Sequence, residues 1–262
     1  MVMVWDWGVK GAAFATGLSQ AAVIFLYLWH FLGPKGSIKF TKFQFDVSTV
    51  FRQIRNGMSS GVTEFSGGII IFFFNQAILR FISEDALVSY TIISYVNTIV
   101  VMSMTGIAQG SQPLISYYFG KGEPKKYRKL LKYGILSAAV FSVVVTAACY
   151  TGASGIVGIF LDGENPALSV YSVKVFRIFI LSFLLAGYNV VIGGYFASIE
   201  KAGFATFISL TRSLIALVGC MMLLIAVLGG EGIWWSPLMA EAVCLVFSLL
   251  MLKRSFAKQR KN

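Results

Sequence analysis

Long, uninterrupted apolar runs constrain this sequence more than any other feature. A helix needs about 20 apolar residues to cross the roughly 30 Å hydrocarbon core of a bilayer. About seven runs reach that length, one of them with polar interruptions: Gly11–Leu32, Ile54–Phe81, Leu87–Ser111, Leu130–Thr151, Val175–Ser198, Phe204–Leu228 and Ile233–Leu252. Because the runs are continuous, without the alternation of β-strands, they favour helices over a barrel. We therefore expect an all-α integral membrane protein with about seven transmembrane helices.

Charged residues are scarce and lie mostly between the runs. They make up 13% of the sequence, against about 25% in soluble domains. Basic residues cluster in residues 34–55, 119–133 and 253–262, and we expect the connection after the fifth run to add Lys201 and Arg212. The intervening connections carry acids, namely Glu84, Asp85, Asp162, Glu164 and Glu231. Positively charged connections stay inside the cell, which predicts a multi-pass plasma-membrane protein with a cytoplasmic C-terminus. The net charge of +11 then reflects topology in a lipid bilayer and not a nucleic-acid partner.

Two acids inside the apolar runs are candidates for function, because ionisable groups in a membrane are costly and usually have a role. Glu64 lies about ten residues into the second run, roughly 15 Å deep at about 1.5 Å per residue. Apolar and small polar residues surround it in the sequence, so we expect it to be buried. It is a candidate for ion coupling and cation binding, and the alternative is a structural carboxylate. For Glu241 in the last run, a structural role is favoured, with a nearby Lys or Arg as its partner.

No motif of a known enzyme class is present. The sequence lacks GxSxG, HExxH and a phosphate-binding loop ending in GK[ST]. Its three cysteines, Cys149, Cys220 and Cys244, lie inside apolar runs without metal-ligand spacing. We therefore expect neither an enzyme nor a metal or cofactor site. Without an ATP-binding motif, an ion gradient is the energy source expected for any transport.

Three stretches together resemble the multidrug and toxic compound extrusion (MATE) family, in particular its bacterial branch. They are WGVKGAAFATGLSQ at residues 7–20, IRNGMSSGVTEF at residues 54–65 with Asn75 further along, and IAQGSQPLISYYFGK at residues 107–121. The third stretch is the most specific, since it contains the Gln-Pro-Leu-Ile-Ser signature of that branch. The resemblance extends along essentially the whole chain.

The resemblance implies how the chain is organised. Members of the family have twelve helices in two six-helix lobes around a central cavity. By this likeness, residues 1–33 are the last helix of the first lobe, residues 34–52 are a cytoplasmic inter-lobe linker, and residues 53–262 are the C-terminal six-helix lobe with a basic tail. The first five helices of the family are then missing from this chain, and they become an expected partner.

The function implied is a cation-coupled antiporter, driven by H⁺ or Na⁺, that exports organic cations and drugs. Candidate coupling or substrate residues are Glu64, Asn75, Tyr188 and Asn189, whereas Glu241 is the candidate structural acid. Some members carry an acid midway along the fifth helix of this lobe, but residues 186–191 read AGYNVV without one. Two alternatives stay open: a lipid-linked oligosaccharide flippase, and a membrane remnant or structural subunit that does not transport.

Overall fold

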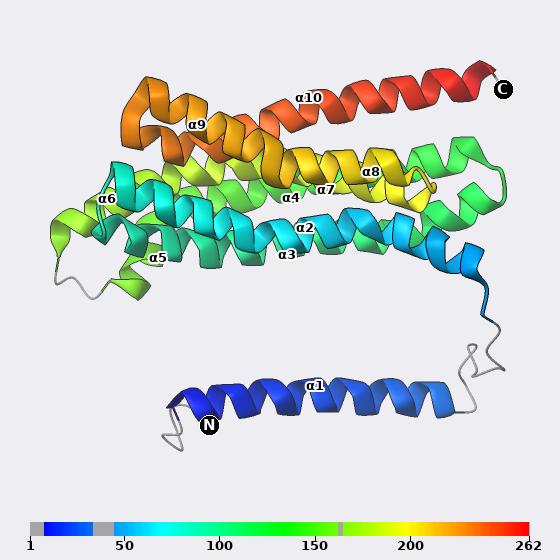
Figure 1. The fold of residues 1–262 in the computed structure, drawn as a ribbon, viewed down its shortest axis with the longest axis horizontal. Coiled ribbons are helices and arrows are strands. Elements are labelled where there is room, and N and C mark those ends of the chain that lie inside the picture. Colours follow the sequence, from blue (N-terminus) through cyan, green and yellow to red (C-terminus); the bar gives the residue numbers. More distant parts are fainter. Residues whose placement is uncertain (1–7, 34–44, 162–164, 262) are drawn as a thin grey trace. The chain divides into compact units, whose positions relative to one another are not determined.

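The computed structural model describes residues 8–33, 45–161 and 165–261, and within them all regular structure is helical (Figure 1). The chain divides into two units, Met1–Ser48 and Thr49–Asn262. Most of the expected linker, residues 34–44, lies outside the described residues, as do the expected loop acids Asp162 and Glu164. The expected all-α membrane fold is confirmed.

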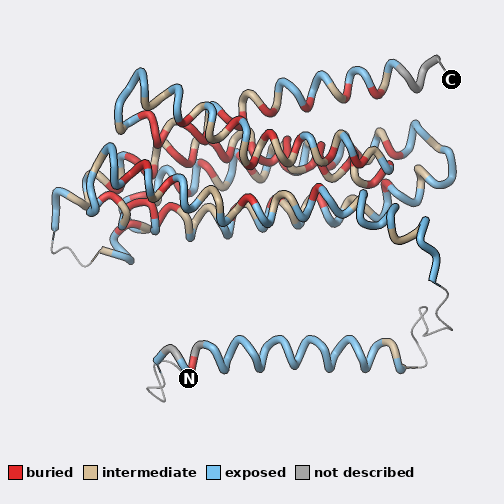
Figure 2. Tube along the Cα trace, viewed as in Figure 1, coloured by how far each residue is buried: buried red, intermediate tan, exposed pale blue. Residues whose placement is uncertain are grey.

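The main described element of the first unit is α1, which runs over Gly8–Leu32. Its stretch Ala13–Leu32 is long and apolar enough to cross a membrane, and none of its hydrophobic window is buried by other residues (Figure 2). Large apolar side chains such as Phe14, Ile24 and Trp29 are exposed. A helix that is apolar on all sides requires lipid or other helices around it.

The second unit is a bundle of long helices that run side by side in alternating directions (Figure 1). Its elements are α2 (Val47–Phe81), α3 (Asp85–Gly120), α4 (Pro124–Thr151), α5 (Ala153–Phe160), α6 (Pro166–Phe179), the 3₁₀ turn η1 (Ile180–Ser182), α7 (Phe183–Ser198), α8 (Ala202–Leu210), the π-helical turn η2 (Thr211–Ile215), α9 (Ala216–Leu228), the 3₁₀ turn η3 (Gly229–Glu231) and α10 (Gly232–Lys261).

Several helices extend beyond the apolar runs expected from the sequence, and α2 and α3 differ in ways that change how those segments are interpreted. Helix α2 begins at Val47, inside the segment assigned to the linker, because apolar residues at i, i+3, i+4 and i+7 from Val47 to Ile54 already form an amphipathic helix. Helix α3 continues through Pro113 to Gly120, well beyond the expected end at Ser111. Pro113 therefore does not close this helix.

Six candidate membrane spans are present among the described residues, the last of them covering Ala202–Ala257. At 56 residues this stretch is far too long for one crossing. The chain reverses at η3, where Gly229 has a φ of +62° that a glycine adopts without steric cost. Figure 1 shows α9 and α10 running in opposite directions from this turn. The stretch thus contains both the sixth and the seventh expected spans.

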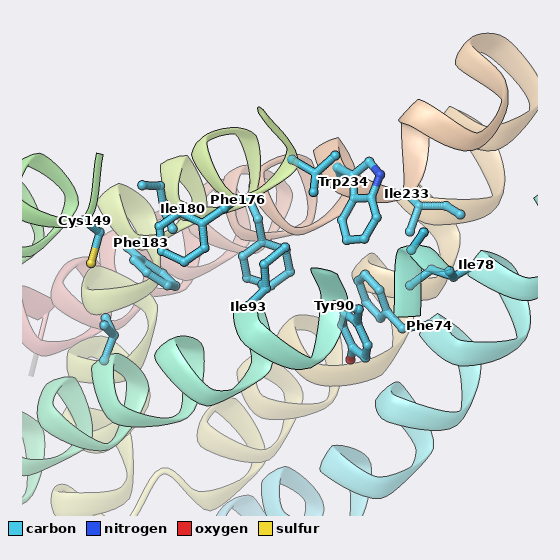
Figure 3. Packing of buried hydrophobic residues seen from close by; sticks show 14 of the residues in the cluster. Phe74, Ile78, Tyr90, Ile93, Cys149, Phe176, Ile180, Phe183, Ile233 and Trp234 are labelled. Atoms are coloured by element: carbon cyan, nitrogen blue, oxygen red, sulfur yellow. The ribbon is translucent and has the colours of Figure 1, made fainter. Parts of the chain in front are cut away.

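The bundle core is built around the span formed by α6, η1 and α7. This span is the most buried of the candidates, at 61% of its hydrophobic window. One apolar cluster joins it to α2, α3 and α10 through large side chains, including Phe74, Tyr90, Phe176 and Trp234 (Figure 3). The Phe74 and Tyr90 rings stack with centroids 4.8 Å apart. The Trp234 indole Nε1–H donates to the Tyr171 hydroxyl at 3.0 Å.

The connections of the bundle separate by charge in the way the sequence indicated. Lys121 and Lys201 lie in the α3–α4 and α7–α8 turns at one end, whereas Glu84 and Glu231 lie in turns at the opposite end (Figure 1). Arg212 was expected in the α7–α8 connection, and this is wrong, because it lies within η2 in the interior of a continuous helical stretch. The assignment of the basic end to the cytoplasm stays a prediction.

We expect a cysteine-accessibility map to place the α3–α4 turn inside the cell. In a background without native cysteines, Lys126→Cys should react with a membrane-impermeant maleimide in inverted vesicles but not in intact cells. Glu84→Cys, in the turn before α3, should show the opposite pattern. Both positions are exposed, so access to their side chains depends on the side of the membrane. Labelling of Lys126→Cys in intact cells would reverse the predicted topology.

Candidate functional site

A cavity of about 700 Å³ lies among the helices of the second unit. Its walls come from α2, α3, α6, η1, α7, α8, η2, α9 and α10. Pockets of about 300–1,000 Å³ accommodate drug-sized ligands. Small side chains leave this space open where helices face one another, notably Ser60 and Gly67 on α2 and Gly193 and Gly194 on α7. The cavity is the natural candidate site of this unit.

Part of the cavity wall is aromatic and part is polar. Phe74, Tyr90, Phe179 and Phe183 line it and also belong to the bundle core, so they form a rigid apolar surface. The polar lining includes hydroxyl and amide side chains from α2, α3 and η2: Thr63, Ser94, Asn97, Gln109, Gln112 and Ser213. An apolar wall with a limited number of polar groups is typical of sites for small organic molecules.

Glu64 lies on α2 and lines the cavity. Its side chain forms no hydrogen bond and no ion pair with any described residue. It is exposed, which corrects the expectation that its surroundings bury it. The sequence neighbours that suggested burial lie along the same helix, where Gly61, Ser60 and Phe65 are also exposed. The carboxylate of Glu64 is consequently open to any ligand of the cavity.

Glu241 on α10 has the opposite environment, because both of its carboxylate oxygens accept hydrogen bonds. Arg212 Nε donates to Oε1 at 2.8 Å, and Asn189 Nδ2 donates to Oε2 at 2.7 Å. The Asn189 amide also donates to the Glu241 main-chain oxygen at 3.0 Å and accepts from Ser248 Oγ at 3.0 Å. The Arg212 and Glu241 side chains are 15% and 11% exposed. This network connects α7, η2 and α10 on one wall of the cavity.

Arg212 occupies the only π-helical turn among the described residues. In this turn the Ala216 N–H donates to the Thr211 carbonyl five residues earlier. The neighbouring Thr211 hydroxyl is buried and has no hydrogen-bond partner among the described residues. Single π-helical turns within α-helices are frequent at functional sites. The π-helical turn η2 therefore lies where Arg212 forms its ion pair with Glu241 at the cavity.

The cavity carries a surplus of negative charge. Its lining contains two carboxylates, Glu64 and Glu241, and one basic side chain, Arg212. Since Arg212 pairs with Glu241, the charge that is not compensated belongs to Glu64. Charges interact more strongly in a low-dielectric bundle than in water. Glu64 is therefore the main source of electrostatic attraction for a cationic ligand in the cavity.

The structure brings some of the predicted site residues together and separates others. Glu64, Asn189 and Glu241 all line the cavity, whereas Asn75 and Tyr188 do not. Asn75 follows the lining residue Phe74 and is therefore turned by about 100° around α2. Tyr188 precedes Asn189 on α7 and is turned away from the cavity in the same manner. A role for these two residues in coupling or substrate binding stays a prediction.

Arg212 is the site residue that sequence reasoning missed. It lies eight positions beyond Phe204, inside the apolar run Phe204–Leu228. A basic residue with apolar sequence on both sides is as unusual in a membrane as an acidic one. This position in the apolar run was the signal by which Arg212 could have been recognised as a candidate site residue. Among the described residues, His, Cys, Asp and Glu side chains form no group of three or more that could hold a metal ion.

The bundle of membrane-length helices is that of a multi-pass membrane protein, and it contains a polar, ligand-sized cavity. The family model described as MatE matches residues 60–222, which is more than half of the chain. The chain belongs to the MatE family. The resemblance found in the sequence is thereby confirmed.

Curated relatives share this family but are longer. Multidrug export protein MepA of Staphylococcus aureus is 24% identical over 261 residues, which cover 96% of this chain and 55% of that protein. The protein of the same name from Staphylococcus saprophyticus is 20% identical, with coverage of 96% and 55%. The chain thus spans about half the length of the curated relatives it matches.

Solved structures show the same fold. An outward-facing multidrug resistance MATE family transporter of the MOP superfamily has a TM-score of 0.89 and 20% identity, with coverage of 100% of this chain and 59% of that chain. A MOP superfamily transporter from Pyrococcus furiosus has a TM-score of 0.91 and 19% identity, with the same coverage of 100% and 59%. At this identity the likeness establishes the fold alone.

Proposed function

We propose that this chain forms the cavity-bearing lobe of a cation-coupled antiporter that exports organic cations and drugs. The observation that carries the proposal is Glu64, a carboxylate with no partner among the described residues, at a cavity of about 700 Å³. Membership of the MatE family and similarity to proteins named multidrug export protein MepA support it.

In the proposed mechanism, the organic cation and the coupling ion, H⁺ or Na⁺, compete for Glu64. The ionised carboxylate attracts an organic cation, and the aromatic wall adds apolar and cation–π contacts. Binding of a proton or sodium ion from the side of high concentration neutralises Glu64 and releases the cation. Because Arg212 already neutralises Glu241, this competition centres on one carboxylate.

The proposal includes a partner. Relatives and solved structures are nearly twice as long as the segment that this chain matches, so we propose that first-lobe helices complete the transporter in the plasma membrane. A lipid-linked oligosaccharide flippase is less favoured, because the matching relatives are named multidrug export proteins. A structural subunit that does not transport is the alternative that the next experiment separates.

Dye accumulation in cells that lack their own exporters tests this proposal. We compare the chain alone with a full-length hybrid in which the N-terminal half of a MepA relative precedes it. Ethidium accumulation should fall several-fold with the hybrid and stay at the vector level with the chain alone. Reduced accumulation with the chain alone would contradict the need for a first lobe. An inserted hybrid without any effect would contradict an export function and favour the structural subunit.

A further inference from the structure

The wall that carries Arg212 presents hydrogen-bond donors to the cavity. Arg212 uses Nε for the bond to Glu241 Oε1. Its terminal nitrogens, Nη1 and Nη2, form no hydrogen bond with any described residue, although the side chain lines the cavity and is 15% exposed. The guanidinium edge formed by Nη1 and Nη2 is thus available to a ligand, whereas Nε is occupied by the bond to Glu241.

The acceptors of the network formed by Arg212, Glu241 and Asn189 already receive hydrogen bonds. Both Glu241 oxygens accept hydrogen bonds, and Asn189 Oδ1 accepts one from Ser248. A ligand that approaches here therefore meets donors that need an acceptor. The planar edge formed by Nη1 and Nη2 matches the two oxygens of a carboxylate, and such bidentate pairs are strong and geometrically specific.

We propose that Arg212 is the binding site for the carboxylate of an amphoteric substrate whose cationic group is bound by Glu64. This inference rests on the proposed function, because it takes the cavity as the drug site, and it adds the substrate class. The favoured substrate carries a delocalised or alkylated cation and a carboxylate in one molecule. A purely cationic drug uses only half of this arrangement.

The helices that carry Glu64 and Arg212 are held together beside the cavity. Ser59 of α2 and Ser209 of α8 share a hydrogen bond of 2.7 Å and both line the cavity. Glu64 follows Ser59 by five residues and Arg212 follows Ser209 by three residues in helices that run in the same direction (Figure 1). At about 1.5 Å per residue the two side chains begin at similar depth. Asn189 and Ser248 act as positioning residues, because they fix Glu241 and through it the guanidinium.

Equilibrium binding to the purified 262-residue chain tests the inference, since every lining residue belongs to this chain. The probes are rhodamine B, which has a free benzoate, and its ethyl ester, which has the same cation without the carboxylate. Fluorescence anisotropy reports the dissociation constant of each dye. A charge-assisted bidentate contact should make the wild type prefer rhodamine B by about tenfold or more.

Variants separate this contact from a structural role of Arg212. Arg212→Gln should abolish the preference for rhodamine B, and because it leaves the Glu241 carboxylate uncompensated, the ester should bind at least as tightly as before. Loss of a merely structural residue would instead weaken both dyes together. Glu241→Gln leaves the guanidinium charge uncompensated and should increase the preference. If either single variant fails to fold, Arg212→Gln/Glu241→Gln retains an uncharged hydrogen-bonding pair and should show no preference.

The outcomes distinguish the two proposals. Equal binding of both dyes by the wild type overturns the carboxylate site and leaves the organic-cation cavity intact. A preference that survives in Arg212→Gln also overturns it. If the folded chain binds neither dye, the cavity is not a drug site, and the proposed function falls together with this inference.

Discussion

Glu64→Gln is expected to lower ethidium export by the full-length hybrid to the level of the empty vector. The substitution keeps the size and hydrogen-bonding capacity of the side chain but removes the charge that attracts a cation. It also removes the group at which the coupling ion competes. Because Arg212 neutralises Glu241, no second free carboxylate of this cavity lining can replace it. Efflux from preloaded cells measures the effect.

Glu84→Gln is the matched control for this experiment. Glu84 is exposed in the turn before α3 and does not line the cavity, so its loss should leave efflux unchanged. Expression of each variant is normalised by quantitative immunoblotting. Wild-type efflux by Glu64→Gln throughout the neutral pH range would show that Glu64 is structural, while the fold and the family would stand.

The second large effect concerns stability. Glu241→Ala should destabilise the bundle by about 3–5 kcal/mol, because it leaves the Arg212 guanidinium in a largely buried site without its counter-ion. The Asn189 amide loses an acceptor in the same step. We expect a clearly lowered midpoint of thermal unfolding in detergent, followed by intrinsic fluorescence or by aggregation of the purified chain.

An exposed ion pair in the same bundle provides the control. Glu231→Ala removes the partner of Lys174, and these two side chains are 60% and 56% exposed. Water and salt screen such a pair, so its loss should cost at most about 1 kcal/mol. Arg212→Gln/Glu241→Gln should recover most of the stability lost in Glu241→Ala. Equal midpoints of thermal unfolding for Glu241→Ala and Glu231→Ala would contradict a stabilising role of the buried network.

The helices of this fold could be predicted well from the sequence, and the physical reason is the membrane itself. Lipid offers no hydrogen bonds, so each apolar run satisfies its backbone groups internally as a helix. Details that depend on neighbouring helices could not be predicted. They include the turns η1 and η2 within continuous spans, and the continuation of α3 through Pro113.

The site was predictable in part. Isolated acids in apolar runs identified Glu64 and Glu241, because ionisable groups are costly there regardless of tertiary structure. Which faces of α2 and α7 meet the cavity depends on packing. From the sequence alone it was therefore not possible to tell that Asn189 lines the cavity and Tyr188 does not. Arg212 carried the same signal as the acids, but its apparent place in a basic connection concealed it.

Reconstitution tests the central claim most directly. The hybrid and its Glu64→Gln variant are placed in proteoliposomes that contain DNA, on which ethidium fluoresces, and a proton or sodium gradient is then imposed. Coupled antiport predicts ethidium accumulation in wild-type vesicles only while one of these gradients is present, and no gradient-dependent accumulation with Glu64→Gln. Accumulation that ignores both gradients, or that persists in Glu64→Gln, would contradict an antiporter coupled through this carboxylate.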